Sequence, residues 1–312
     1  PITDDDTSLI RIEAAGICGS DMHAYHGHDA RRVPPLILGH ELSGVAHTGP
    51  HTGKTVALNP MITCDSCRDC LAGNPNLCAQ RDLLGLGQPG GFAQWVSVKT
   101  ANVIPLSETL STTVASLMEP TAVSLHAIRL AERALLRPLS ECRTLVIGGG
   151  AIGLLAGLIL KHKGARTLFV AETNALRRAT VQRQGIEDVY DPINDAAPAQ
   201  NTFDLVVDAV GSGATRRAAS ELCRAGGVIS HIGLQDNEAG LDTRRLTLQE
   251  IVFIGNYTYN PIDLWASLQL LEEGALGDLS WVESRPLSDG ANAFEAIHNG
   301  SAAAAKIVLH PN

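Results

Sequence analysis

Residues 141–173 have the sequence ECRTLVIGGGAIGLLAGLILKHKGARTLFVAET, and they decide the fold of one half of the chain. The apolar run TLVIG ends in glycine, which is typical of a buried parallel strand. The glycines that follow match G-x-G-x-x-G: the first permits a tight turn, the second lets the backbone approach a pyrophosphate, and the third lets helix and strand pack closely. Because the pattern follows a strand and opens an apolar helix, it predicts a dinucleotide site. The candidate residues are Gly148, Gly150, Ala151, Ile152 and Gly153.

The next strand ends at Glu172, near the spacing of ~20 residues at which an acidic side chain contacts the adenosine ribose. A carboxylate there accepts hydrogen bonds from the ribose hydroxyls and repels a 2′-phosphate, so the sequence favours NAD over NADP. Arg177 and Arg178 keep NADP open, because a nearby arginine can hold that phosphate. We count Arg177 as a candidate cofactor residue; the alternative is that both arginines are solvated charges on the following helix.

Further apolar runs at 203–211, 226–234 and 250–259 are typical of strands of the same sheet, and 214–225 is a helical segment between the first two. Alternating strands and helices predict a doubly wound parallel sheet. The residues before 141 instead contain short β-like runs punctuated by Pro and Gly. The predicted fold class is therefore α/β, with a β-rich part ahead of the dinucleotide-binding part.

Four of the seven cysteines lie in residues 64–78, CDSCRDCLAGNPNLC. Thiolates at this spacing can close a tetrahedron around Zn²⁺, and a site with four protein ligands has no open position, so this zinc would be structural. A disulfide, four reduced thiols and an iron–sulfur cluster are the alternatives. The acidic start of the chain is not a signal peptide, which counts against the disulfide. The predicted ligands are Cys64, Cys67, Cys70 and Cys78, and the isolated Cys142 and Cys223 are expected to fill apolar space near the sheet.

A second candidate metal group combines Cys18, in AAGICGSDMHAYHG, with His40 and Glu41, in LILGHELSGV. One thiolate, one imidazole and one carboxylate suit a catalytic zinc, which keeps one position open for water or substrate. Each residue alone is ambiguous, since a lone buried cysteine usually belongs to the core. Together with the separate four-thiol cluster, the three residues form a pattern that is specific for a catalytic zinc site.

These motifs resemble the zinc-dependent medium-chain dehydrogenase/reductase family from about Leu9 to Leu309: GICGSD, GHE, the cysteine lobe, MEPTAVSLHA and GGGAIG occur in its order and spacing. The resemblance implies a GroES-like catalytic domain at 1–120 and 258–312 and a Rossmann NAD-binding domain at 121–257. It also implies that Cys18 and His40 bind catalytic zinc, with Glu41 as a third or exchangeable ligand. The family's first strands are absent or abbreviated here, which leaves open whether the N-terminus is complete.

Glu119, in MEPTAVSLHA, discriminates within that family. Ethanol-type members carry a cysteine ligand near this place, whereas polyol-type members carry a glutamate followed by proline, as here. Oxygen in place of a thiolate makes the zinc harder and more Lewis-acidic. The alternative role for Glu119 is an acidic residue stabilised by the positive end of a helix.

The resemblance also implies a proton path, in which Ser20 takes the alcohol proton and His23 passes it to solvent through the cofactor ribose while hydride moves to nicotinamide. A hydroxyl and an imidazole suit this task because both donate and accept. Asp21 matches the carboxylate that orients the ligating histidine, although a turn-forming role fits it nearly as well. The following loop supplies candidates that either line the pocket or face water: Tyr25, His26 and His28.

The composition excludes several function classes. With 45% hydrophobic and 18% charged residues among 312, the chain is typical of a globular protein of two domains. It lacks an apolar run of ~18 residues, so no membrane partner is expected. A net charge of −9 argues against a nucleic-acid partner. Seven cysteines in a chain of this length, without a secretory signal, fit a reducing compartment, which predicts a cytoplasmic location. The family resemblance implies a homodimer or homotetramer, with 250–259 as a candidate edge strand.

The sequence thus predicts a zinc-dependent NAD(H) oxidoreductase that oxidises a secondary alcohol of a polyol or sugar alcohol to a ketone. The expected cofactors are a catalytic Zn²⁺, a structural Zn²⁺ and NAD. A threonine or simple alcohol dehydrogenase of the same family is the alternative. A non-catalytic zinc- and dinucleotide-binding protein is a more remote one, and the complete ligand set counts against it.

Overall fold

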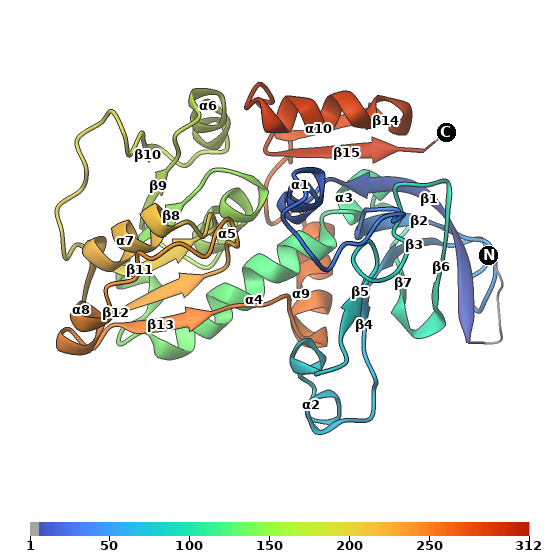
Figure 1. Cartoon of the computed structure of the whole chain (residues 1–312), viewed down its shortest axis with the longest axis horizontal. Coiled ribbons are helices and arrows are strands. Elements are labelled where there is room, and N and C mark those ends of the chain that lie inside the picture. Colours follow the sequence, from blue (N-terminus) through green and yellow to red (C-terminus); the bar gives the residue numbers. More distant parts are fainter. Residues whose placement is uncertain (1–5, 312) are drawn as a thin grey trace. The chain divides into compact units, whose positions relative to one another are not determined.

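The computed structural model describes residues 6–311, and the chain divides into two compact units. The first unit comprises the chain up to Ala122, Tyr259–Ala302 and the segment from Lys306; the second comprises Val123–Thr258 and residues 303–305. Figure 1 labels the elements of both units. The start of the chain, on which the expectation of an abbreviated N-terminus rests, lies outside the described residues.

The second unit is built on a six-stranded sheet in the order β10-β9-β8-β11-β12-β13, in which every pairing is parallel. Its strands are β8 (Arg143–Ile147), β9 (Thr167–Ala171), β10 (Asp188–Tyr190), β11 (Phe203–Asp208), β12 (Cys223–His231) and β13 (Val252–Gly255). The chain runs outward from β8 to β10 and then returns to β11 on the other side. The strand order therefore reverses between β8 and β11, which is where ligands bind in sheets of this type. The predicted Rossmann fold is confirmed.

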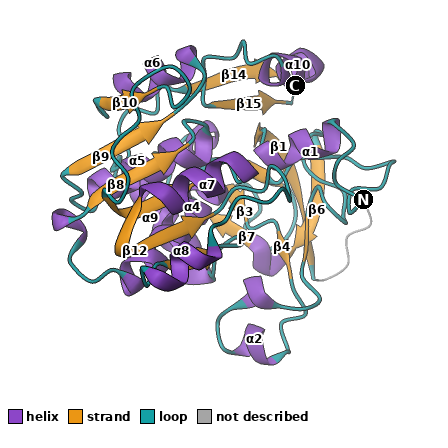
Figure 2. Cartoon of the chain, turned by 60° about the vertical axis from the view of Figure 1, so that its left-hand side comes forward, coloured by secondary structure: helices purple, strands orange, loops and turns teal. Residues whose placement is uncertain are grey.

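Helices connect these strands, and Figure 2 shows them in purple beside the orange sheet. They are α5 (Ala151–His162), α6 (Ala175–Arg183), α7 (Gly213–Leu222) and α8 (Thr243–Leu248). Their starts follow from local chemistry: the side chain of Asn174 caps α6, and Ser212 forms a capping box with Thr215 at α7. The apolar run in α5 is buried, because this crossover helix packs on the sheet.

The strand predicted over 250–259 is shorter than expected, because β13 ends at Gly255. The side chain of Asn256 donates to the carbonyls of His231 and Ile254 and to Ser230 Oγ, so the chain turns there. Thr258 has a φ of 49°, outside the extended region. The side-chain hydrogen bonds of Asn256 thus end the strand, although the apolar sequence pattern continues beyond it.

The first unit contains a seven-stranded sheet in the order β14-β15-β1-β2-β3-β7, with β6 also paired to β1. Its strands are β1 (Thr7–Gly16), β2 (Glu41–Ala46), β3 (Thr55–Leu58), β6 (Trp95–Lys99), β7 (Val103–Pro105), β14 (Val282–Pro286) and β15 (Lys306–His310). An irregularity between Ile12 and Ala14 lets β1 change partners along its length. The C-terminal segment returns to this sheet with the strands β14 and β15 and one α-helix between them, and the predicted GroES-like β-rich unit is confirmed.

Short helices complete the first unit: α1 (Gly19–Tyr25), α2 (Arg68–Leu71), α3 (Thr112–Ala115), α9 (Pro261–Glu272) and α10 (Gly290–His298). Helix α4 (Met118–Ala134) begins in the first unit and continues into the second. The hairpin of β4 (Met61–Ile62) and β5 (Asp82–Leu83) carries the cysteine segment. Within residues 6–311, none of the helices combines the length and apolar character that crossing a bilayer requires.

Candidate metal centres and cofactor loop

The four cysteines of residues 64–78 converge in the lobe that projects from the β4–β5 hairpin. Their Sγ atoms are 3.9 Å apart for Cys64–Cys70, and 3.5 Å apart for both Cys67–Cys70 and Cys64–Cys78. Sulfurs bound at 2.3 Å in a tetrahedron lie about 3.8 Å from one another, so this set fits a zinc ion. The separations are far too long for a disulfide, which requires about 2.05 Å.

Local backbone geometry produces this convergence. Cys67 is the N-cap of α2, and Asp65 and Gly73 adopt left-handed conformations, with φ of 59° and 79°, that turn the chain on either side of it. Backbone N–H groups of Ser66 and Cys67 donate to Cys64 and lower the pKa of that thiol to about 6. The lowered pKa favours the thiolate of Cys64, which is the form that binds metal.

The second candidate centre joins α1 to the start of β2. One ligand atom each from Cys18, His40 and Glu41 lie within 4.8 Å of one another. Cys18 immediately precedes α1, while His40 and Glu41 enter β2, so two segments of the first unit supply the group. His40 and Glu41 are buried and Cys18 is half-buried. A mixed set of one thiolate, one imidazole and one carboxylate fits an ion with an open coordination position.

Asp21 lies beside two residues of this centre, Cys18 and His40. Its Oδ2 accepts from the backbone N–H of Cys18 at 3.0 Å, and its Oδ1 lies 3.6 Å from His40 Nδ1. The carboxyl group is fully buried, and Oδ1 has no hydrogen-bond partner in the structure. A hydrogen bond from His40 Nδ1 to this oxygen would leave Nε2 as the ring nitrogen free to bind an ion.

Excess negative charge gathers at the same place. Burial of His40 would by itself lower its pKa, but Asp21 and Cys18, and then Glu119, outweigh this and raise the pKa to about 10. Glu119 lies in the first turn of α4, and burial raises the pKa of its carboxyl group to about 7. Among the described residues it does not belong to the group within 4.8 Å. The raised pKa of His40 means that the acidic groups around it favour a positive charge, which a divalent cation would also supply.

Glu41 has a partner that sequence reasoning missed. Lys306 Nζ donates to both of its carboxylate oxygens at 2.6 Å and to the carbonyl of Ile17 at 2.8 Å. Burial would lower the pKa of Lys306, but Glu41 outweighs it and raises that pKa. The available signal was a single lysine opening the otherwise apolar segment KIVL, since a charge in a buried strand requires a partner.

Ser20 and His23 both lie on α1, and Arg32 holds one of them. The Arg32 guanidinium donates to Ser20 Oγ at 3.1 Å and to the Ser20 carbonyl at 2.7 Å. His23 is half-buried, and burial lowers its pKa while Asp29 opposes the shift. Ser20 therefore has a fixed hydroxyl, and the lowered pKa of His23 favours its neutral imidazole.

The three glycines of the phosphate-binding pattern each meet a different physical requirement. Gly148 has a φ of 102° at the turn, and a Cβ on Gly153 would collide with the Gly148 carbonyl. A Cβ on Gly150 would meet nothing within 4 Å. The first glycine thus makes the turn, the third permits close packing, and the second faces open space beside the N-terminus of α5. Ala151 and Ile152 form the first turn of that helix.

Glu172 lies at the end of β9 as predicted, and its carboxylate is already engaged by backbone. Its oxygens accept from Gly149 N at 2.6 Å and Asn174 N at 2.7 Å, so it also holds the glycine loop. Arg178 donates to the carbonyl of Glu172 and pairs with Asp191 at 3.1 Å, so its guanidinium has a structural role. Nε of Arg177 is buried and lacks a hydrogen-bond partner.

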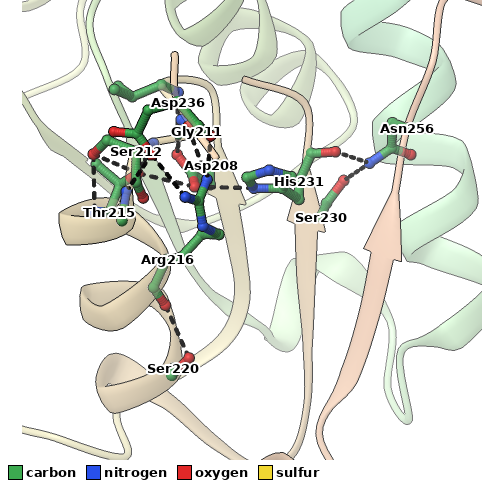
Figure 3. Close-up of polar contacts among 12 residues, drawn as sticks. Asp208, Gly211, Ser212, Thr215, Arg216, Ser220, Ser230, His231, Asp236 and Asn256 are labelled. Atoms are coloured by element: carbon green, nitrogen blue, oxygen red, sulfur yellow. Dashed lines mark hydrogen bonds and ion pairs between the residues drawn. The ribbon is translucent and has the colours of Figure 1, made fainter. Parts of the chain in front are cut away.

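A polar network that sequence reasoning missed lies at the carboxyl ends of β11 and β12 (Figure 3). Asp208 accepts from Gly211 N at 2.9 Å, from Thr215 Oγ1 at 3.0 Å and, in the tautomer with a proton on Nδ1, from His231 at 3.0 Å. Arg216 ties this loop to the next by donating to Asp236 Oδ1 at 2.7 Å. The network fixes the loops at the ligand-binding edge of the sheet. Its signal in the sequence was an acidic residue closing a buried strand, FDLVVD.

Comparisons with known proteins agree with this arrangement. Residues 4–108 match the alcohol dehydrogenase GroES-like domain, and residues 151–273 match the zinc-binding dehydrogenase domain. The chain is 31% identical to L-galactonate-5-dehydrogenase of Escherichia coli over 95% of this chain and 89% of that protein. It is 27% identical to an L-threonine 3-dehydrogenase of Rhizobium etli, with 96% and 90% covered.

A solved structure extends the likeness to three dimensions. Galactitol-1-phosphate dehydrogenase of Escherichia coli superposes with a TM-score of 0.88 at 25% identity, covering 100% of this chain and 94% of that one. The family is shown by the two domain matches and by a relative above 30% identity across nearly the whole chain. The polyol-type glutamate at residue 119 agrees with the branch. The chain therefore belongs to the zinc-dependent medium-chain dehydrogenase/reductase family, in its polyol-dehydrogenase-like branch.

Proposed function

We propose that this protein oxidises a secondary alcohol of a polyol or sugar acid to a ketone, with NAD as the hydride acceptor and zinc at the Cys18–His40 centre. The observation that supports it most directly is the cluster of Cys18, His40 and Glu41 within 4.8 Å, with the buried carboxyl of Glu119 electrostatically coupled to it. The sugar-acid and polyol-phosphate dehydrogenases among its relatives support the substrate class.

When bound, zinc supplies Lewis acidity that lowers the pKa of a substrate hydroxyl, and NAD supplies the acceptor for hydride. The chain's own residues supply the remaining functions. Cys18 and His40 would hold the ion, Asp21 would orient His40, and Glu119 would offer a further oxygen ligand. Lys306 donates to both carboxylate oxygens of Glu41, so Glu41 would act as an exchangeable ligand only after these hydrogen bonds break.

Ser20 takes the alcohol proton in this scheme, and His23 passes it towards solvent. Arg32 occupies one acceptor site of Ser20 Oγ, which leaves the other for the substrate proton. The lowered pKa of His23 keeps its ring able to accept that proton. Both residues share α1, so their spacing is fixed by the helix.

We propose NAD rather than NADP because Glu172 directly follows β9, where a carboxylate is expected to accept hydrogen bonds from the ribose hydroxyls and to repel a 2′-phosphate. Arg177 supports the opposite preference, and a comparison of kcat/KM for the two cofactors decides between them. We also propose a cytoplasmic homodimer or homotetramer. Strand β13 lies at the edge of its sheet and offers unpaired backbone groups for a second copy, and light scattering would give the mass.

A panel of polyols, aldonates, threonine and simple alcohols, assayed by NAD reduction on protein of measured zinc content, tests the proposal. We expect two zinc ions per chain and the highest kcat/KM among polyols or aldonates. Turnover of ethanol with none of any polyol or aldonate would overturn the substrate class. The L-threonine 3-dehydrogenases among the relatives favour threonine as the second candidate, and the same panel includes it.

A further inference from the structure

Two imidazoles from opposite ends of the chain meet at the surface of the first unit. His26 Nε2 lies 2.9 Å from His298 Nδ1. His26 is the C-cap of α1, and His298 is the last residue of α10. Both side chains are exposed, and neither belongs to the metal centres described above.

The pair is held by packing beneath it. The ring of Tyr25 lies 5.4 Å from that of His26, 5.7 Å from that of Phe294 and 5.9 Å from that of His298. Met22 of α1 and Phe294 of α10 share one apolar cluster. The two helices are thus fixed against each other, and the two ring nitrogens are brought together without a flexible loop between them.

The two nitrogens share a hydrogen bond, and the same two atoms would be available to a metal ion once that proton is released. Neutral imidazole is a preferred ligand of Ni²⁺, Cu²⁺ and Zn²⁺. With metal–nitrogen bonds of about 2.05 Å, a nitrogen separation of 2.9 Å corresponds to an angle of about 90° at the ion, the angle between adjacent ligands in octahedral or square-planar geometry. Tetrahedral Zn²⁺ would need about 3.3 Å, so the rings would separate by about 0.4 Å.

The neighbouring loop places a third imidazole near the pair, and the acidic side chain of Asp29 in that loop is already paired. His28 brings a further imidazole, with its ring 5.5 Å from that of His26. The nearest acidic side chain in that loop, Asp29, is engaged by Arg31 and Arg32. Because the pair is exposed, water can complete the coordination of an ion held by two imidazoles.

We propose that His26 and His298 form a third metal site, which binds a divalent transition metal and ties the end of α1 to the end of α10. The site prefers Ni²⁺ or Cu²⁺ to Zn²⁺ because of the angle between its two nitrogens. It is solvent-facing and exchangeable, unlike the four-cysteine site. Its existence does not depend on the dehydrogenase reaction.

Calorimetric titration of Ni²⁺ into zinc-loaded protein without a polyhistidine tag tests the proposal. We expect one equivalent of Ni²⁺ to bind beyond the two zinc ions, and this equivalent to disappear in His26→Gln and in His298→Gln. His162→Gln, which removes an exposed imidazole from α5 of the other unit, is the matched control and should bind like the wild type. Loss of the equivalent in the control as well, or its persistence in both site variants, would overturn the proposal.

The pH dependence gives a second readout that needs no variant. Protons compete with the metal for imidazole nitrogen, so affinity for Ni²⁺ should fall as the pH is lowered from about 7.5 to about 5.5. An affinity that does not change over this range would exclude histidine ligands. Thermal melting of both variants checks that they remain folded, which is expected because each change lies at the exposed end of a helix.

Discussion

Lys306 Nζ lies 2.6 Å from both carboxylate oxygens of Glu41, although the two residues open strands that are far apart in the sequence. Both side chains are almost fully buried. Strand β1 places them together, because its last residue, Gly16, pairs with Val308 on one side and with Glu41 on the other. A Cβ on Gly16 would collide with the Glu41 carboxylate, so this glycine provides the room for the ion pair.

Replacing Lys306 by Met should destabilise the protein strongly, because it leaves a buried carboxylate without a partner. The expected cost is about 3–5 kcal/mol of unfolding free energy, measured by chemical denaturation. The double variant Lys306→Met with Glu41→Leu should recover most of this loss, since a buried ion pair replaced by apolar groups is often neutral. Lys163→Met, which breaks a half-exposed pair with Glu132, is the control and should cost about 1 kcal/mol or less. Equal costs for the two lysines would show that the buried pair is not the cause.

The two cysteine sites should respond differently to loss of one sulfur. Cys18→Ser should abolish turnover and remove one zinc ion while the melting temperature changes little, because the surrounding sheet does not depend on that ion. Cys67→Ser should lower the melting temperature and free the other zinc ion, because the lobe has little apolar core of its own. Metal analysis and calorimetry of both variants measure this. The assignment of one structural and one catalytic zinc site is contradicted if Cys67→Ser melts like the wild type or if Cys18→Ser retains full activity.

Glu119 should make the stability of protein lacking the catalytic zinc depend on pH. Its folded pKa, about 7, lies above its ordinary value, so the unfolded chain loses this proton at lower pH than the folded chain does. The unfolding free energy is thus undiminished below about pH 4.5, falls as the pH rises towards 7, and stays lower above it. Denaturation in the Cys18→Ser background, with and without Glu119→Gln, isolates this group. We expect the Gln variant to lose less stability between pH 5 and pH 7; parallel curves would contradict the buried, protonated carboxyl.

Two glycines of the phosphate-binding loop should separate cofactor binding from stability. Gly153→Ala places a Cβ against the Gly148 carbonyl, so it should lower stability by about 1–3 kcal/mol and weaken NAD binding. Gly150→Ala meets no protein atom, so the fold should keep its melting temperature while NAD affinity falls, because the Cβ occupies the space of the pyrophosphate. Fluorescence titration of NADH and thermal melting of both variants provide the comparison. A destabilised Gly150→Ala, or one that binds NADH normally, would contradict this division.

The sequence determined those features that depend on short spacings. The glycine pattern fixes a turn and a helix start within six residues, and its three positions have the φ, the close contact and the open space that their roles require. The four cysteines lie on one tight lobe, so their spacing alone brings the sulfurs to 3.5–3.9 Å in the measured pairs. The strand predicted at 250–259 is longer than the observed β13, because an apolar pattern carries no information about the side-chain hydrogen bonds of Asn256.

Only the tertiary structure decided which distant side chains meet. Lys306 and Glu41 are joined by the register of three strands, His26 and His298 by the packing of two helices, and Asp208 and His231 by two parallel strand ends that lie side by side. Sequence patterns report the local preferences of each segment, whereas these pairings depend on how buried surfaces from separate segments fit together. Charge placed in such an interior must find a partner, but its identity follows from the register and not from the neighbouring residues in the chain.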